Sequence, residues 1–126
     1  MLKKRVIISL TFLDGILYRT KKFKPDYRYT KNFLDLWSID ELIINDISKK
    51  KFSYQFLELV NFFSKNCFVP ISVGGGIRKL DDADIFFKNG ADKIVLGSNL
   101  NSYDTIKDIS MKYGKQSIIQ SLDLKK

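Results

Sequence analysis

The 126-residue sequence contains no histidine and only one cysteine, Cys67. Without histidine, the chain lacks the side chain that most often serves as a general base near neutral pH and as a metal ligand. A single cysteine excludes a disulfide within the chain. We therefore expect no metal site and no cofactor, and a cytoplasmic protein.

Long apolar runs are also missing. None approaches the ~20 residues that a membrane-spanning helix needs. The start Lys3-Lys4-Arg5 is followed by an apolar stretch, as in a signal peptide, but this stretch is short, stops at Asp14-Gly15 and has no small-residue cleavage site. With 44% hydrophobic and 29% charged residues, the composition is that of a soluble globular protein, and we expect no membrane partner.

Basic residues outnumber acidic ones. The chain has 22 lysines and arginines and 14 aspartates and glutamates, which gives a formal net charge of +8. The lysines form only short clusters at 21–22, 49–51 and 125–126, without the aromatic-interleaved stripe of a nucleic-acid surface. We expect no nucleic-acid partner. The excess charge is either a solvated lysine-rich surface or a field that favours phosphorylated substrates.

Strand-like and helix-like segments alternate along the chain. Apolar, β-branched runs predict five strands, and apolar residues at helical spacing predict the helices between them. The predicted strands are 5–12, 41–46, 68–73, 93–96 and 117–123. The predicted helices are 53–64, 80–89, 102–113 and a weak one at 32–37. Residues 16–20 suggest a short hairpin arm, followed by a polar, mobile-looking segment at 21–29.

This alternation, at intervals of roughly 25 to 35 residues, indicates an α/β fold with a parallel sheet. The chain is small for an α/β barrel, which usually needs about 250 residues. Gly90 and Gly114 stand where helices should end.

Three consecutive glycines, Gly74 to Gly76, occupy the corner between a predicted strand and a predicted helix. Glycine lets backbone N–H groups approach an anion, and the helix that follows adds the positive end of its dipole. A tight turn that merely requires positive φ explains the same glycines. Both readings remain open on the glycines alone.

Polar residues recur where the predicted strands end. These are Thr11 and Asp14 after the first strand, Asp46 after the second, Gly97-Ser98 after the fourth and Asp123 after the fifth. In an α/β barrel the chemistry lies at this end of the strands. Each carboxylate alone is as well explained by a loop cap as by catalysis, but their recurrence on one rim favours a site.

Several segments together carry a family resemblance. They are 1–7, 13–15, 40–42, 46–47, 73–78 and 90–93. The chain resembles, over its whole length, the cyclase subunit of imidazole glycerol phosphate synthase. The resemblance implies a (β/α)8 TIM barrel, of which 1–126 would be a truncated N-terminal half with four βα units and strand five. The glycine corner and Gly-Ala-Asp-Lys are shared with the sister isomerase of histidine synthesis.

The family's cyclase takes ammonia from a glutaminase subunit and adds it to a phosphorylated ribulosyl aminoimidazole nucleotide. Two aspartates serve as acid and base. Asp123 matches the second, but Thr11 stands in place of the first, and a threonine hydroxyl cannot act as a base near neutral pH. Ser9 and Arg19 also replace a usual cysteine and lysine. The resemblance further implies a phosphate and substrate site at Gly74, Gly75, Gly76, Gly97, Ser98 and Asp46.

The rim at the other end of the predicted strands, where they begin, keeps more of the family pattern. Arg5, Glu41 and Lys93 match three of the four charged residues that form the family's ammonia gate, and Asp92 matches an acidic residue that docks the glutaminase. A chain that keeps the docking residues but lacks one catalytic aspartate resembles the divergent branch of this family that is associated with amidation of surface-polysaccharide sugars.

Three functions therefore remain open. The chain is a cyclase subunit of histidine biosynthesis, a partner in ammonia-dependent sugar amidation, or a non-enzymatic half barrel. A five-stranded parallel sheet leaves open edges at its first and fifth strands, and a homodimer of half barrels would cover them.

Overall fold

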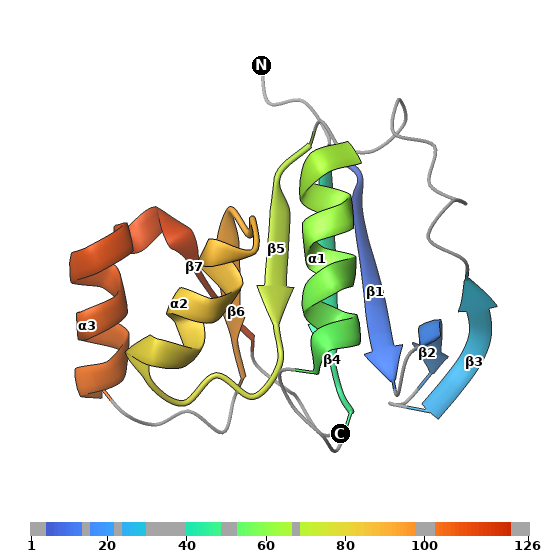
Figure 1. Cartoon of the computed structure of the whole chain (residues 1–126), viewed down its shortest axis with the longest axis horizontal. Helices are drawn as coiled ribbons and strands as arrows, with labels where there is room; N and C mark the ends of the chain where they lie inside the picture. Colours follow the sequence, from blue (N-terminus) through green and yellow to red (C-terminus); the bar gives the residue numbers. More distant parts are fainter. Residues whose placement is uncertain are drawn as a thin grey trace.

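The computed structural model describes residues 5–13, 16–21, 24–29, 40–48, 53–66, 69–97 and 103–121. Its elements, shown in Figure 1, are β1 (Ile7–Leu13), β2 (Ile16–Lys21), β3 (Lys24–Tyr29), β4 (Glu41–Asp46), α1 (Tyr54–Asn66), β5 (Ile71–Gly74), α2 (Leu80–Lys88), β6 (Lys93–Leu96), α3 (Tyr103–Tyr113) and β7 (Ile118–Gln120). A single 3-10 turn, Lys115–Ser117, joins α3 to β7.

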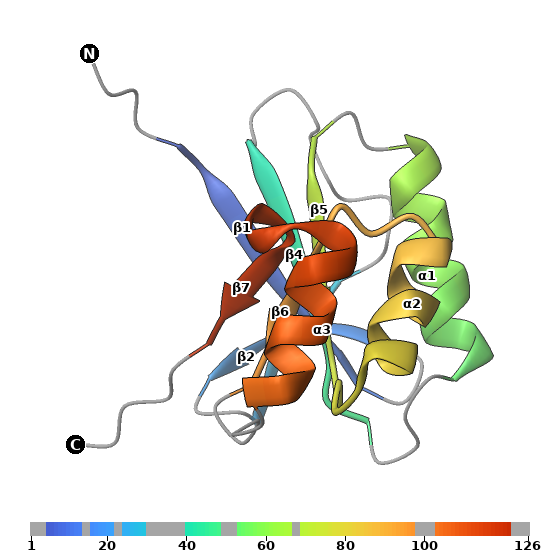
Figure 2. The same ribbon diagram turned by 90° about the vertical axis from the view of Figure 1, so that its left-hand side faces the viewer.

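The strands form one sheet in the order β3-β2-β1-β4-β5-β6-β7. From β1 to β7 the neighbours pair in parallel and follow chain order, whereas a doubly wound sheet reverses its order part-way. Helices α1, α2 and α3 all lie on one side of the sheet (Figure 2). Helices on a single face of a parallel sheet are the arrangement of a TIM barrel. The predicted α/β fold of a partial barrel is confirmed.

The core lies between the helices and the sheet. In α1, Phe56, Val60 and Phe63 recur at helical spacing and are buried. The ring of Phe56 packs against Phe12 of β1 at 5.1 Å and against Phe86 of α2 at 5.8 Å between centroids. Aromatic pairs at these distances add to the free energy gained from burial. The aromatics of α1 therefore hold the layers together.

The two faces of the sheet differ in burial. Alternate residues of a strand point to opposite faces. Leu10 and Phe12 of β1 and Ile44 of β4 face the helices and are buried. On the other face, Ile7 is 48% exposed and Ser9 is also exposed. That second face corresponds to the interior of the barrel.

Part of the segment 21–29, which the sequence suggested to be polar and mobile, forms a strand. Residues 24–29 form β3, which pairs with β2 in antiparallel fashion, with a register shift at Arg19/Thr20. Pro25 lies in this strand, where β3 is the edge of the sheet and a missing N–H is tolerated. The tyrosines at 27 and 29 favour strand conformation.

The prediction of an open edge at the first strand also needs correction, because β2 pairs with Thr11 to Leu13 of β1. The predicted strand 68–73 begins only at Ile71, and the predicted strand 117–123 is described as β7, 118–120. The predicted helix at 32–37 lies outside the described residues. Gly90 and Gly114 follow α2 and α3 with φ of 107° and 92°, so both predicted helix ends are confirmed.

Within the described ranges, the helices are too short or too polar for any of them to cross a membrane.

Candidate functional site

The N-terminal rim, where the parallel strands begin, carries the cluster of Arg5, Glu41 and Lys93. Glu41 opens β4 and Lys93 opens β6, while Arg5 precedes β1. The Oε1 atom of Glu41 lies 3.2 Å from Nη2 of Arg5 and 3.5 Å from Nζ of Lys93. The Glu41 side chain is only 8% exposed, against 54% for Arg5 and 33% for Lys93. The structure thus brings together all three residues predicted for the gate.

The sheet register explains this convergence. Ile43 of β4, Ser72 of β5 and Lys93 of β6 are aligned partners, and Glu41 precedes Ile43 by two residues. All four therefore point to the barrel-interior face. Ser72 is fully buried there, and within the described part of the chain its hydroxyl has no hydrogen-bond partner.

Asp92 is fixed at the same rim. Its Oδ2 atom accepts a hydrogen bond of 2.8 Å from the N–H of Ile71, and its own N–H donates to the Ile71 carbonyl at 2.8 Å. The residue is nevertheless exposed. An acidic side chain is thereby held in one position at the surface of the rim. Asp40 plays a comparable part beside it, accepting a 2.7 Å bond from the N–H of Val6.

The C-terminal rim, where the parallel strands end, contains the glycine corner. A Cβ on Gly74 would lie 2.4 Å from Oδ1 of Asn45, and one on Gly75 would lie 2.8 Å from the carbonyl of Asp46. Gly75 and Gly76 also have φ of 141° and 67°. Close approach to β4 and positive φ both require glycine here. The geometry thus supports the interpretation of the glycines as a tight turn, whether or not the corner binds a ligand.

The positive end of α2 is already compensated by the chain itself. Helix α2 begins at Leu80, and Asp82 in its first turn is buried. The Oδ2 atom of Asp82 accepts hydrogen bonds from the N–H groups of Arg78 at 2.9 Å and Lys79 at 3.2 Å. A carboxylate at this position satisfies N–H groups that would otherwise face an anion. A phosphate at this rim would therefore rely on the glycine backbone more than on the helix.

The other predicted residues of the C-terminal rim are only partly brought together. The Oδ1 atom of buried Asp46 accepts a 2.9 Å bond from the N–H of Ser48, which is a loop cap. Thr11 is half-buried and aligned with Asn45 of β4. Gly97 has open space where a Cβ would be. Asp14, Ser98 and Asp123 lie outside the described residues.

No group of three or more histidine, cysteine, aspartate or glutamate residues that could hold a metal ion occurs in the ranges the structure describes.

A clamp between α2 and α3 was not predicted. The Tyr113 hydroxyl donates a hydrogen bond to Oδ1 of Asp84, and Nζ of Lys112 lies 2.9 Å from the same oxygen. The Tyr113 ring stacks on Phe87 at 3.9 Å between centroids. In the sequence, Tyr113 is only the last residue of the predicted helix 102–113, and nothing local links it to Asp84, 29 residues away.

The clamp shifts the titration of its members. The hydrogen bond from Tyr113, followed by that from Lys112, lowers the pKa of Asp84. Burial, followed by the hydrogen bond to Asp84, raises the pKa of Tyr113. The hydrogen bond to Asp84 raises the pKa of Lys112.

Comparison with known proteins shows to which family the chain belongs. The model of a family described as "Histidine biosynthesis protein" matches residues 15–126. The chain belongs to this histidine biosynthesis family. The resemblance carried by residues 1–7, 13–15, 40–42, 46–47, 73–78 and 90–93 is therefore confirmed, together with the family's barrel fold.

Three curated relatives illustrate the match. A protein of Parasynechococcus marenigrum with the provisional name imidazole glycerol phosphate synthase subunit hisF2 is 42% identical over 99% of this chain and 50% of its own length. A Campylobacter jejuni protein of the same name is 34% identical, over 100% and 53%. The imidazole glycerol phosphate synthase subunit HisF of Staphylococcus epidermidis is 37% identical, over 98% and 52%. The chain thus spans about half the length of these relatives.

Proposed function

We propose that this chain is the ammonia-receiving part of a HisF-type synthase subunit. A glutaminase partner docks at the N-terminal rim, and a phosphorylated substrate binds at the C-terminal rim. The observation that carries the proposal is the ion-pair cluster of Arg5, Glu41 and Lys93. The names of the relatives support the type of subunit. For such a biosynthetic activity we propose a cytoplasmic location.

The cluster has the charge and geometry of a selective entrance. One buried carboxylate lies between two cations, so the cluster repels an ammonium ion but not neutral ammonia. The Lys93 contact is the longer of the two, at 3.5 Å, and this side chain is a third exposed, so its amine can move aside. Beyond the cluster, the Ser72 hydroxyl offers a hydrogen bond to the incoming molecule.

Two substrates are compatible with this entrance. The first is the ribulosyl aminoimidazole nucleotide of histidine biosynthesis, with Asp123 as one acid–base group. The second is a surface-polysaccharide sugar that becomes amidated. Thr11 favours the second, because its hydroxyl keeps its proton near neutral pH and cannot replace a catalytic carboxylate.

A chimera tests the substrate. This chain is joined to the C-terminal half of the Staphylococcus epidermidis HisF subunit, and ammonia-dependent turnover of the ribulosyl nucleotide is measured. We expect little turnover with Thr11 and a gain of about 100-fold or more in Thr11→Asp, since general base catalysis contributes about 10²- to 10⁴-fold. Thr11→Asn, which has the shape of aspartate without its basicity, is the matched control.

The outcomes separate the alternatives. Equal turnover with Thr11 and with Thr11→Asp assigns the chain to histidine biosynthesis and contradicts the argument from Thr11. A gain only in Thr11→Asp favours the sugar substrate. A folded chimera without turnover of the ribulosyl nucleotide in any variant contradicts the histidine-pathway substrate and leaves the sugar substrate or a non-enzymatic half barrel.

A further inference from the structure

A row of four aligned residues crosses the sheet near the C-terminal ends of its strands. The row consists of Thr11 of β1, Asn45 of β4, Gly74 of β5 and Val95 of β6, each aligned with the next. Thr11 follows the exposed Ser9 by two residues, so the row lies on the barrel-interior face. Neighbouring strands are about 4.8 Å apart, so one small ligand can contact adjacent members of the row. None of the four residues is charged.

Gly74 makes room for the Asn45 side chain in this row. A Cβ on Gly74 would lie 2.4 Å from Oδ1 of Asn45 and 2.9 Å from Cβ of Val95. The two glycines that follow have positive φ, but Gly74 does not. Close approach alone therefore requires glycine at this position. The amide oxygen of Asn45 occupies the space that a side chain at position 74 would fill.

The side chains of Thr11 and Asn45 offer both donors and acceptors. Asn45 is half-buried, and within the described ranges its amide makes no hydrogen bond. The amide provides two N–H donors and an acceptor oxygen, and the Thr11 hydroxyl provides one donor and two acceptor lone pairs. An ionised carboxylate at either position would only accept. Because sugar hydroxyls both donate and accept, this uncharged pair suits them better than it suits an anion.

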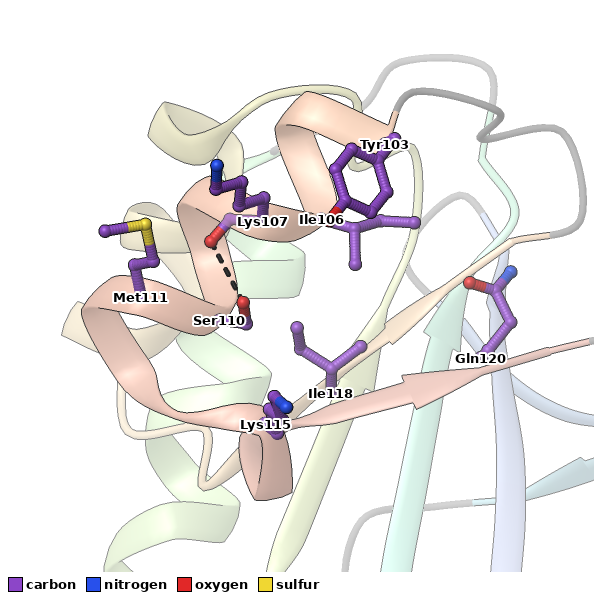
Figure 3. Close-up of a pocket in the computed structure, with 8 residues that line it drawn as sticks. All are labelled: Tyr103, Ile106, Lys107, Ser110, Met111, Lys115, Ile118 and Gln120. Atoms are coloured by element: carbon purple, nitrogen blue, oxygen red, sulfur yellow. Dashed lines mark hydrogen bonds between the residues drawn. The ribbon is translucent and has the colours of Figure 1, made fainter.

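A groove on the opposite face of the sheet offers less to such a ligand. It has a volume of about 600 Å³ and lies between α3 and β7, where Ile118 points into it (Figure 3). The Ser110 hydroxyl already donates to the carbonyl of Lys107 at 2.9 Å. Nε2 of Gln120 donates to the carbonyl of Gly97 at 3.2 Å. These two polar groups are thus engaged within the chain, unlike the amide in the row.

We propose that Thr11 and Asn45 form an uncharged hydrogen-bonding subsite for the hydroxyl groups of a neutral sugar ring. The inference rests on the proposed function and selects the sugar as its substrate. The hydroxyl of Thr11 and the amide of Asn45 bind neighbouring ring hydroxyls. Val95, which is 8% exposed, packs against the C–H groups of the ring on the other side of Gly74. Thr11 is then a binding residue in its own right.

The side-chain amide of Asn45 can report binding directly by NMR. Its signal in the isotopically labelled 126-residue chain is assigned by its disappearance in Asn45→Leu. Glucose, galactose, mannose, N-acetylglucosamine and N-acetylgalactosamine are titrated in turn, and inorganic phosphate is the charged probe. We expect at least one sugar to shift the Asn45 signal in a saturable manner and phosphate to leave it in place. The amide of Asn66, which donates to the Phe62 carbonyl on α1, should not respond.

Matched variants test the two side chains. Thr11→Val removes the hydroxyl at nearly constant volume, and Asn45→Leu replaces the amide by an apolar group. One neutral hydrogen bond contributes a factor of about 2 to 10 in affinity, so each variant should weaken sugar binding by at least about twofold. Asn66→Leu is the same change outside the row and should leave binding unaltered. Binding is followed here on the backbone signal of Gly74, and circular dichroism checks the fold.

Three results would overturn the proposal. These are a panel in which no sugar shifts the Asn45 signal, sugar binding that Thr11→Val and Asn45→Leu leave intact, and a saturable shift of Asn45 by phosphate, which would assign the row to an anion. The readout needs neither turnover nor a glutaminase. Sugar binding without glutaminase docking would therefore refute the proposed function alone, and docking without sugar binding would refute the subsite alone.

Discussion

The two rims of the sheet use their charged residues in different ways. At the N-terminal rim, the carboxylate of Glu41 joins two cations from separate parts of the chain. At the C-terminal rim, the carboxylates of Asp46 and Asp82 accept hydrogen bonds from nearby backbone N–H groups. Charges at the first rim form a long-range cluster, whereas those at the second shape loops. The N-terminal rim, where we propose that ammonia enters, is therefore organised independently of the C-terminal rim, where we propose that the substrate binds.

The largest effect is expected at the glycine corner. Gly75→Ala would place a Cβ 2.8 Å from the Asp46 carbonyl, at a φ of 141°. Backbone strain and this contact should lower the free energy of unfolding by about 3 kcal/mol. Gly97→Ala, which meets open space, should change it by less than about 0.5 kcal/mol. Urea denaturation measures both, and equal effects would show that the corner is not structurally constrained.

Removing the central carboxylate of the N-terminal rim should have the next largest effect. Glu41→Gln removes the counter-charge that Arg5 and Lys93 share. Breaking a buried pair costs about 3–5 kcal/mol, but both partners reach solvent, so we expect about 1–2 kcal/mol. Glu58→Gln, on the exposed face of α1, is the control. If the two variants unfold at the same urea concentration, the cluster contributes nothing to stability.

The smallest effect concerns the clamp of Asp84, Lys112 and Tyr113, which lies away from both rims. The lowered pKa of Asp84 means that its stabilising contribution is present above about pH 4 and is lost as the pH falls through the folded-state value. The raised pKa values of Tyr113 and Lys112 mean that their contributions are present below about pH 10 and are lost as the pH rises.

Asp84→Asn should therefore flatten the dependence of unfolding free energy on pH below about pH 4, without changing glutaminase binding at the N-terminal rim. Asp108→Asn on α3 should keep the profile of the unmodified chain. Denaturation at a series of pH values gives both curves, and identical acid limbs for the two variants would show that the clamp is not formed.

Local patterns made much of the fold predictable. The apolar runs that became β4 and β6, and the spacing of Phe56, Val60 and Phe63, are set by neighbouring residues. Gly90 and Gly114 were placed by the same kind of signal, because positive φ at a helix end favours glycine.

What could not be predicted depends on distant partners or on competing local signals. Strand β3 forms by pairing with β2, and its own polar sequence gave no alternation. The clamp joins two helices through residues 29 positions apart. The cap made by Asp82 had a local signal, an acidic residue in the first turn of a helix, but the three glycines drew the interpretation towards an external anion.

Docking of a glutaminase tests the central claim most directly, because it probes the N-terminal rim itself. Asp92→Asn keeps an oxygen that can accept the Ile71 N–H but removes the charge, and Asp108→Asn removes an equivalent exposed charge from α3. A glutaminase subunit of imidazole glycerol phosphate synthase is titrated into each variant by calorimetry. We expect binding that Asp92→Asn weakens about tenfold or more, as for a charge in an interface, and that Asp108→Asn leaves unchanged. Absence of binding, or equal binding by both variants, would contradict it.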